Sequence, residues 1–195
     1  MLKGTLESKE IISSDFTRGD LELIRQRGWL TYELTGASFS HLQKENPDFL
    51  KIWQPCSDWG KFSFHEVEKI VPPKKVSFNP SIVILPLTNN KGINEQMEEL
   101  DRLTSSVQKW LPNSKFILGT VRDYLELDII HFETKGTRLL KSNQRIRTAT
   151  FTGALECIVN PNFGAWYSYD QLGEEGETGG SEDLWVMPLL VHQTK

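Results

Sequence analysis

The middle of the chain carries apolar residues at helical spacing. Four of them share one stripe of an expected helix: Met97, Leu100, Val107 and Trp110. The side-chain oxygen of Asn94 can cap the first turn, and Pro112 prevents the helix from continuing. The pattern therefore predicts a helix over about residues 94–111, with its apolar stripe against the core.

Shorter helical patterns come earlier in the chain. Residues 20–27 predict a helix that is capped by Asp20 and ended by Gly28, because glycine readily adopts the left-handed backbone of a helix end. Two further short helices are expected over residues 38–46 and 47–53.

Short or alternating apolar runs predict strands in the rest of the chain. We expect them over residues 29–34, 76–78, 82–85, 115–120, 124–133, 145–159, 164–169 and 184–191. The 124–133 run alternates most clearly, because Leu125, Leu127 and Ile129 are separated by acids, and a period of two is typical of a strand.

The connections between the later strands are too short to hold crossover helices, so neighbouring strands should be antiparallel. We therefore expect an α+β fold, in which a mostly antiparallel sheet in the C-terminal half is packed by one long helix (about 94–111) and the short N-terminal helices. We expect one domain over residues 1–195, with a corner or linker near residues 71–75.

Composition supports a folded chain with a core. Of the 195 residues 38% are hydrophobic, and six Trp, four Tyr and ten Phe are far more aromatic residues than a disordered chain usually has. The net charge of −4 argues against a generic nucleic-acid coat protein. Cys56 and Cys157 alone cannot form a disulfide framework or a thiolate zinc site, so we expect no metal and no cofactor.

Targeting patterns are also missing from the sequence. The first residues lack a basic stretch followed by an apolar run, and the apolar stretch at residues 81–87 is too short to span a bilayer. The low cysteine content fits a reducing compartment. We therefore expect a cytoplasmic protein that has no membrane partner.

A cluster of basic residues lies in a stretch without acids, residues 135–154. It contains Lys135 and four candidate binding residues: Arg138, Lys141, Arg145 and Arg147. Three aromatic residues follow on a strand that could be adjacent: Trp166, Tyr167 and Tyr169. Arginines beside aromatic rings on a sheet can bind single-stranded nucleic acid, since charge follows the phosphates and rings stack on bases. A solvated strand face is the plainer interpretation.

An acidic, glycine-rich segment follows, over residues 170–183. It holds six carboxylates and four glycines and no base, and such a run is typical of a solvated loop. It lacks the fixed ligand spacing of a calcium-binding EF-hand loop. It could instead dock on a basic partner or on the basic cluster of a second copy.

The sequence contains one weak candidate for catalysis. On the expected 124–133 strand, His131 and Glu133 would share a face, which is sufficient for a general acid/base pair. No third member of such a site can be identified, so a surface pair or a buried histidine with its own partner is the favoured interpretation of the two residues. No phosphate-binding loop, nucleophile elbow or zinc-protease motif is present.

Aromatic residues are dense near Trp53, Trp59, Phe62 and Phe64, where they form core or a partner anchor. Together with the segregated charge and the missing catalytic motifs, this density favours a non-catalytic interaction or assembly subunit. Such a subunit would bind a protein partner through a β-sheet face and an aromatic surface. A nucleic-acid-binding protein with a basic strand face and an enzyme on an unfamiliar scaffold are the two alternatives.

Overall fold

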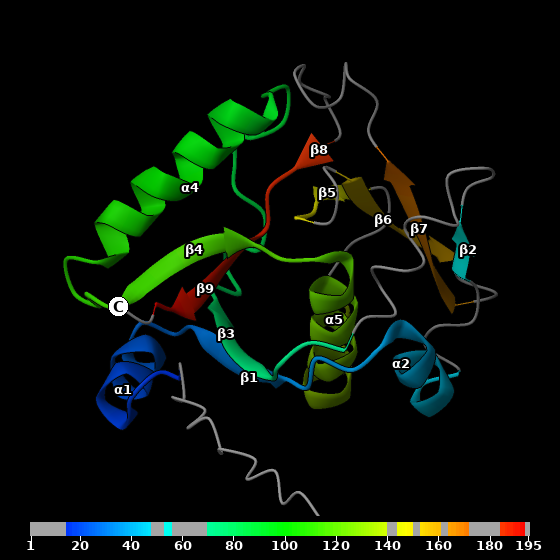
Figure 1. The fold of residues 1–195 in the computed structure, drawn as a ribbon, viewed down its shortest axis with the longest axis horizontal. Coiled ribbons are helices and arrows are strands. Elements are labelled where there is room, and N and C mark those ends of the chain that lie inside the picture. Colours follow the sequence, from blue (N-terminus) through cyan, green and yellow to red (C-terminus); the bar gives the residue numbers. More distant parts are fainter. Residues whose placement is uncertain are drawn as a thin grey trace, which may run out of the picture.

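The computed structural model describes residues 15–47, 53–55, 70–139, 144–149, 153–160, 164–171 and 184–193. Within these ranges the chain forms four helices: α1 (Arg18–Gln26), α2 (Phe39–Glu45), α4 (Ile93–Val107) and α5 (Val121–Lys135). It also forms nine strands, which lie in two sheets (Figure 1). The α+β class expected from the sequence is confirmed.

The first sheet has four antiparallel strands in the order β1-β3-β9-β4. They are β1 (Leu30–Leu34), β3 (Lys74–Phe78), β9 (Pro188–His192) and β4 (Ser114–Leu118). Two of these strands precede the long helices in sequence, so this sheet is not confined to the C-terminal half. The last strand, β9, lies inside this sheet, where it pairs with both β3 and β4.

Both faces of the first sheet are buried. On β9 the successive residues Leu189 and Leu190 belong to two different apolar clusters, as alternating side chains of a strand require. One cluster joins the sheet to α5, and the other joins it to α1 and α4 through residues such as Ile24 and Leu100. The result is a layer of strands between helices (Figure 1).

The second sheet lies on the other side of α5 and has five strands in the order β2-β7-β6-β5-β8. They are β2 (Trp53–Pro55), β7 (Gly164–Gln171), β6 (Gly153–Asn160), β5 (Gln144–Arg147) and β8 (Leu184–Trp185). The three central strands are antiparallel, whereas β2 pairs with β7, and β8 with β5, in parallel. Ile146 of β5 is buried in the same apolar cluster as α5, so this helix lies between the two sheets (Figure 1).

The strand expected over residues 124–133 is wrong, because these residues belong to helix α5. Thr120 caps this helix, and its hydroxyl and the Asp123 carboxylate each accept a backbone N–H from the other residue, at 3.2 and 2.8 Å. Gly136 ends it with a left-handed φ of 70°. With 15 residues each, α4 and α5 are equally long, so the expectation of a single long helix is not confirmed.

The starts of two helices differ from the expected ones because other residues cap them. Helix α1 is capped by Thr17, and Asp20 is the third helical residue, whose carboxylate accepts the Thr17 N–H at 2.9 Å. Helix α4 begins after Gly92 rather than at Asn94, and the Gly92 N–H donates to Glu95 at 3.1 Å. Both starts therefore use an acid in the first turn to accept the backbone N–H of the cap.

Several other expected elements differ from the structure. Residues 82–85 form an irregular loop rather than a strand, and Trp53 begins a strand rather than ending a helix. The expected strand 145–159 is two antiparallel strands, β5 and β6. The expected strand 184–191 is also two, because β8 and β9 lie in different sheets and are separated by the buried residues Val186 and Met187.

Candidate functional site

An open cleft of about 420 Å³ lies between the irregular loop after β3 and the C-terminal end of α5. Its apolar walls come from both segments: Pro80, Ile82, Val83, Ile84, Pro86 and Leu139. Its polar groups are the hydroxyls of Ser81 and Thr137, the imidazole of His131 and the guanidinium of Arg138. We refer to this site as the His131 cleft.

His131 lies at the boundary between the cleft and the core. Its Nδ1 is 3.1 Å from the hydroxyl of Tyr32 on β1, and its ring packs edge-on against Phe78. Burial lowers the pKa of His131, and Lys135 acts in the same direction, whereas Asp128 opposes the shift. Burial also raises the pKa of Tyr32. Both side chains are therefore neutral near pH 7, and they form one hydrogen-bonded pair.

Arg138 lies beside the cleft opposite a buried acid. Its Nη1 is 3.3 Å from the carboxylate of Asp128, which is fully buried and also accepts the backbone N–H of Leu139 at 2.6 Å. The guanidinium lies 5.2 Å from the ring centroid of Phe132. Asp128 thus holds the chain that follows α5 in place, and with it the arginine at the cleft.

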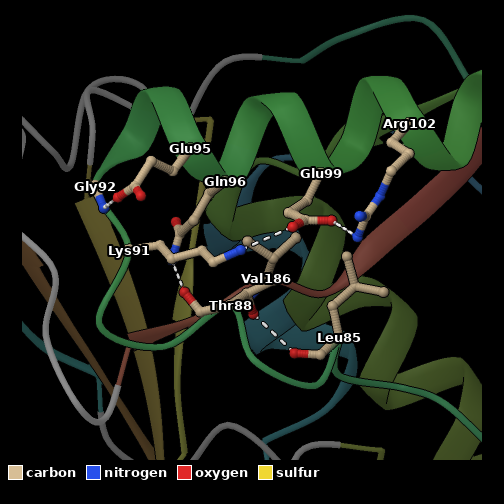
Figure 2. A network of polar contacts seen from close by, with 9 residues as sticks. All are labelled: Leu85, Thr88, Lys91, Gly92, Glu95, Gln96, Glu99, Arg102 and Val186. Carbon is tan, nitrogen blue, oxygen red and sulfur yellow. Dashed lines mark hydrogen bonds and ion pairs between the residues drawn. The ribbon is translucent and has the colours of Figure 1, made fainter.

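The loop that forms the other wall is anchored at its end. Leu85 and Val186 are joined by a backbone hydrogen bond of 2.9 Å, and the hydroxyl of Thr88 accepts the Val186 N–H at 3.1 Å. The buried side chain of Gln96 on α4 donates to the carbonyl of Thr88 at 2.7 Å (Figure 2). Leu87, between these anchors, is 78% exposed and has a φ of 63°, which is rare for a branched side chain.

A second surface gathers aromatic residues where α1, β1, α4 and β4 meet. Trp29 lies 5.9 Å from Trp110 and 5.8 Å from Phe116, measured between ring centroids. These rings line a hollow of about 380 Å³, and Trp29 also lines a second one of about 470 Å³ along β1. We refer to the two hollows together as the Trp29 groove.

Charge and backbone make the Trp29 groove suitable for a partner. The guanidinium of Arg27 lies 4.1 Å from the centroid of the Trp110 ring, and no carboxylate of the described residues pairs with it. Strand β1 is an edge strand of the first sheet, so within the described chain one side of its backbone has no strand neighbour.

The structure brings together two of the predicted site residues, His131 and Arg138, which line one cleft. It does not bring Glu133 to His131. On a helix, residues two apart point in different directions, and Glu133 is exposed whereas His131 is 8% exposed. The pairing of His131 with Glu133 was based on a strand, and the helix removes that basis.

The arginines of β5 have different surroundings. Arg147 is fully buried, and its Nε donates to the side-chain carbonyl of Gln96 on α4. Arg145 is partly buried. Arg147 is therefore part of the internal contact between α4 and the second sheet, rather than of a solvent-facing row with Arg145.

The predicted aromatic residues of β7 are one strand removed from these arginines, because β6 lies between β5 and β7. The register aligns Tyr167 and Tyr169 with Gln144 and Ile146, not with the arginines, and Trp166 precedes them on the same strand. Four candidates lie outside the described residues: Lys141, Trp59, Phe62 and Phe64. The acidic segment from residue 172 to residue 183 lies outside them as well.

Sequence reasoning missed the partners that complete both surfaces. Tyr32 is 99 residues from His131, and Trp29 is far in sequence from Trp110, so no local pattern connects either pair. Among the described residues, no group of three or more His, Cys, Asp and Glu side chains could hold a metal ion. No helix in the described ranges is long and apolar enough to cross a membrane.

The comparisons with known proteins give no family for this chain. No family model, no curated protein and no solved structure matches it. The two surfaces therefore have to be interpreted from their own geometry and chemistry.

Proposed function

We propose that the chain is a non-catalytic interaction or assembly subunit that binds a protein partner at the Trp29 groove. The observation that carries this proposal is the contact of Arg27 with Trp110 beside two hollows that share Trp29. Tryptophan and arginine are the residues most enriched at the energetic centres of protein interfaces. Here both occur together on a partly exposed surface.

The groove favours a partner segment that carries an apolar side chain next to a carboxylate. The hollow below Arg27 is lined by the rings of Trp29, Trp110 and Phe116, which suits an apolar anchor. Arg27 is held over an aromatic ring and has no acidic partner in the described chain. Its guanidinium can therefore bind a carboxylate of the partner with little loss of side-chain entropy.

The neighbouring edge strand adds a second mode of contact. Along β1, the second hollow exposes the strand from Leu30 to Glu33, with Arg25 of α1 and Lys75 of β3 at its sides. An extended partner segment can pair with such an edge through backbone hydrogen bonds, while its side chains enter the hollows. This arrangement combines the sheet surface and the aromatic surface expected of an interaction subunit.

A charge reversal at Arg27 tests the proposal. The immobilised wild-type chain, Arg27→Glu and Arg18→Glu are compared for the proteins that they retain from a native lysate of the cells that express the chain. Arg18 is an exposed arginine of α1 outside the groove and serves as the matched control. We expect that the wild type and Arg18→Glu retain the same protein and that Arg27→Glu binds this protein at least about tenfold more weakly. The reason is that the substitution places a glutamate next to the carboxylate of the partner, and two like charges repel each other.

Sedimentation of the three purified chains covers the case in which the partner is a second copy. A dimer that forms in the wild type and in Arg18→Glu and is lost in Arg27→Glu supports the proposal. The proposal is wrong if no protein is retained and the chain is monomeric, or if all three chains retain the same proteins equally.

A further inference from the structure

We infer that the first turn of helix α5 binds a small oxyanion, such as phosphate or sulfate, through the buried guanidinium of Arg122. Arg122 is the second residue of this helix, and only 3% of its surface is exposed. Its Nε and Nη1 are buried and have no hydrogen-bond partner among the described residues. The site is different from the Trp29 groove, so the inference does not depend on the proposed protein partner.

The missing partners of Arg122 are the main reason for this inference. A charge that is removed from water costs free energy unless it is paired, and a buried polar atom without a partner can mark the place of a bound ion. Asp123, the next residue, is already paired, because its carboxylate lies 2.7 Å from Nζ of Lys74. Glu126, one turn after Arg122, accepts the backbone N–H and the hydroxyl of Thr35. An oxyanion would supply the acceptors that neither acid provides.

The position of Arg122 adds the end of the helix to the site. Side chains of a helix are tilted toward its N-terminus, so the side chain of the second residue lies beside the first turn. The backbone N–H groups of this turn carry the partial positive charge of the helix, and such ends bind phosphate and sulfate. The capping contacts use the N–H groups of Thr120 and Asp123, and that of Arg122 is not among them. Arg122 therefore offers a backbone donor as well as its guanidinium.

The surroundings of the first turn define the size and the kind of the ligand. Lys74 of β3 reaches Asp123 from one side, and the N–H of Ala149, after β5, donates to the carbonyl of Gly119 at 2.8 Å. With so little of Arg122 exposed, the ligand should be a small ion rather than a bulky molecule. A planar guanidinium donates N–H groups in fixed directions, which match the oxygens of phosphate or sulfate better than a spherical chloride ion.

Thermal unfolding of the purified chain tests this inference, with phosphate as the probe and sodium chloride of the same ionic strength as the reference. For a dissociation constant of about 1 mM, about 10 mM phosphate should raise the melting temperature of the wild type by about 2–5 °C. Phosphate at high concentration stabilises many proteins because it is excluded from their surface. The comparison is therefore made at this low concentration and with two variants.

Arg122→Met removes the guanidinium and should lose the gain in phosphate, while its melting temperature in chloride stays at or above that of the wild type. Arg102→Met changes an exposed arginine of α4 and is the matched control, so it should keep the gain of the wild type. A gain of the same size in both variants would mean a general salt effect, and it would overturn the inference.

Hydrogen exchange of the wild type, measured by mass spectrometry, locates the ion and keeps the test decisive if Arg122→Met is poorly folded. Peptides that cover the first turn of α5 should exchange about threefold or more slowly in phosphate than in chloride, whereas peptides from α1 should change less. The inference is also overturned if the wild type melts at the same temperature in both salts, or if phosphate does not slow exchange in the first turn of α5.

Discussion

The carboxylate of Glu126 on helix α5 is buried and hydrogen-bonded to a distant part of the chain. One of its oxygens accepts the backbone N–H and the hydroxyl of Thr35, both at 2.6 Å, and the other accepts the Gly36 N–H at 3.3 Å. Each interaction crosses about ninety residues of sequence and fixes the turn between β1 and α2. The acid therefore supplies acceptors for backbone N–H groups of this turn, of which that of Gly36 belongs to a buried residue.

Glu126→Gln should destabilise the fold, because an amide offers one acceptor where the carboxylate offers two and sets an N–H against a backbone donor. We expect a loss of about 1–3 kcal/mol in the free energy of unfolding, measured by urea titration with circular dichroism. Glu133→Gln on the same helix is the control, since Glu133 is exposed and should change stability by less than about 0.5 kcal/mol. Equal losses in both variants would contradict this account of the turn.

Arg122 presents the opposite case. It is 3% exposed, and its Nε and Nη1 have no hydrogen-bond partner in the part of the chain that the structure describes. A buried cation with two unpartnered nitrogens costs stability, so Arg122→Met should leave the melting temperature unchanged or raise it. Arg138→Met is the comparison. It removes the guanidinium that faces the buried Asp128 and should cost about 1–3 kcal/mol. A loss of that size in Arg122→Met would show that Arg122 has a stabilising partner.

His131 gives the stability a dependence on pH. Burial lowers its pKa in the folded chain below the ordinary value of 6.5, so the unfolded chain binds the proton more readily. Its contribution is therefore fully present above about pH 6.5 and is lost as pH falls through the lower pKa of the folded state. We expect the free energy of unfolding to fall between pH 7.5 and 5 (about the range in which histidines titrate) and to fall less in His131→Gln. Parallel curves for the two chains would refute this role.

At the scale of elements, patterns among neighbouring residues predict the helices that bury only one face. Helix α2 lies within the expected range 38–46, with Ser38 as its cap, and after α1 Gly28 has the expected left-handed backbone, with a φ of 74°. The start of β1 is also close to the expected one. These features depend on a few neighbouring residues, and so the sequence alone was sufficient to find them.

Helix α5 could not be found in this way, because it has no apolar stripe. Residues 121–129 are all buried, since the helix lies between two sheets, and its acids are paired outside the helix, Glu126 with the distant Thr35 and Asp128 with Leu139. Alternating Leu125, Glu126, Leu127 and Asp128 imitates the period of a strand, although each acid has a buried partner. The same distance in sequence hid the site, in which Tyr32 meets His131.

Two glycines at the ends of α5 differ in why they are needed. Gly136 has a φ of 70°, and a Cβ added there would meet no other atom within 4 Å, so Gly136→Ala should cost only the conformational penalty of about 1–2 kcal/mol. At Gly119 a Cβ would lie 2.7 Å from Leu189 and 3.0 Å from the Tyr124 ring. Gly119→Ala should therefore cost more, because the hydroxyl of this same ring accepts the Gly119 N–H at 2.8 Å and holds the ring in place. Chemical denaturation of both variants measures the order, and a larger loss in Gly136→Ala would contradict it.

At the scale of the molecule, α5 connects the two sheets. Tyr124 is fully buried and its hydroxyl donates to the carbonyl of Met187 at 2.7 Å, between β8 of one sheet and β9 of the other. From α4, Gln96 contacts Arg147 of β5 and the carbonyl of Leu184 of β8. Both the His131 cleft and the Trp29 groove combine segments from distant parts of the sequence, so each surface depends on the whole arrangement.

If one core joins the two sheets, a cavity made beside the second sheet should weaken the first. Ile146 of β5 is fully buried in the cluster that also holds Val76 of β3 and Leu189 of β9. We expect Ile146→Ala to cost about 2–5 kcal/mol and to raise hydrogen exchange equally in peptides from β3, β9 and β5, measured by mass spectrometry in moderate urea. Leu23→Ala, at a 41% exposed position of α1, is the control and should change exchange little. A shared core transmits the cost of a cavity to every strand that it holds. Loss of protection in β5 alone would therefore mean that the two sheets unfold as separate units, which would contradict the single domain expected for this chain.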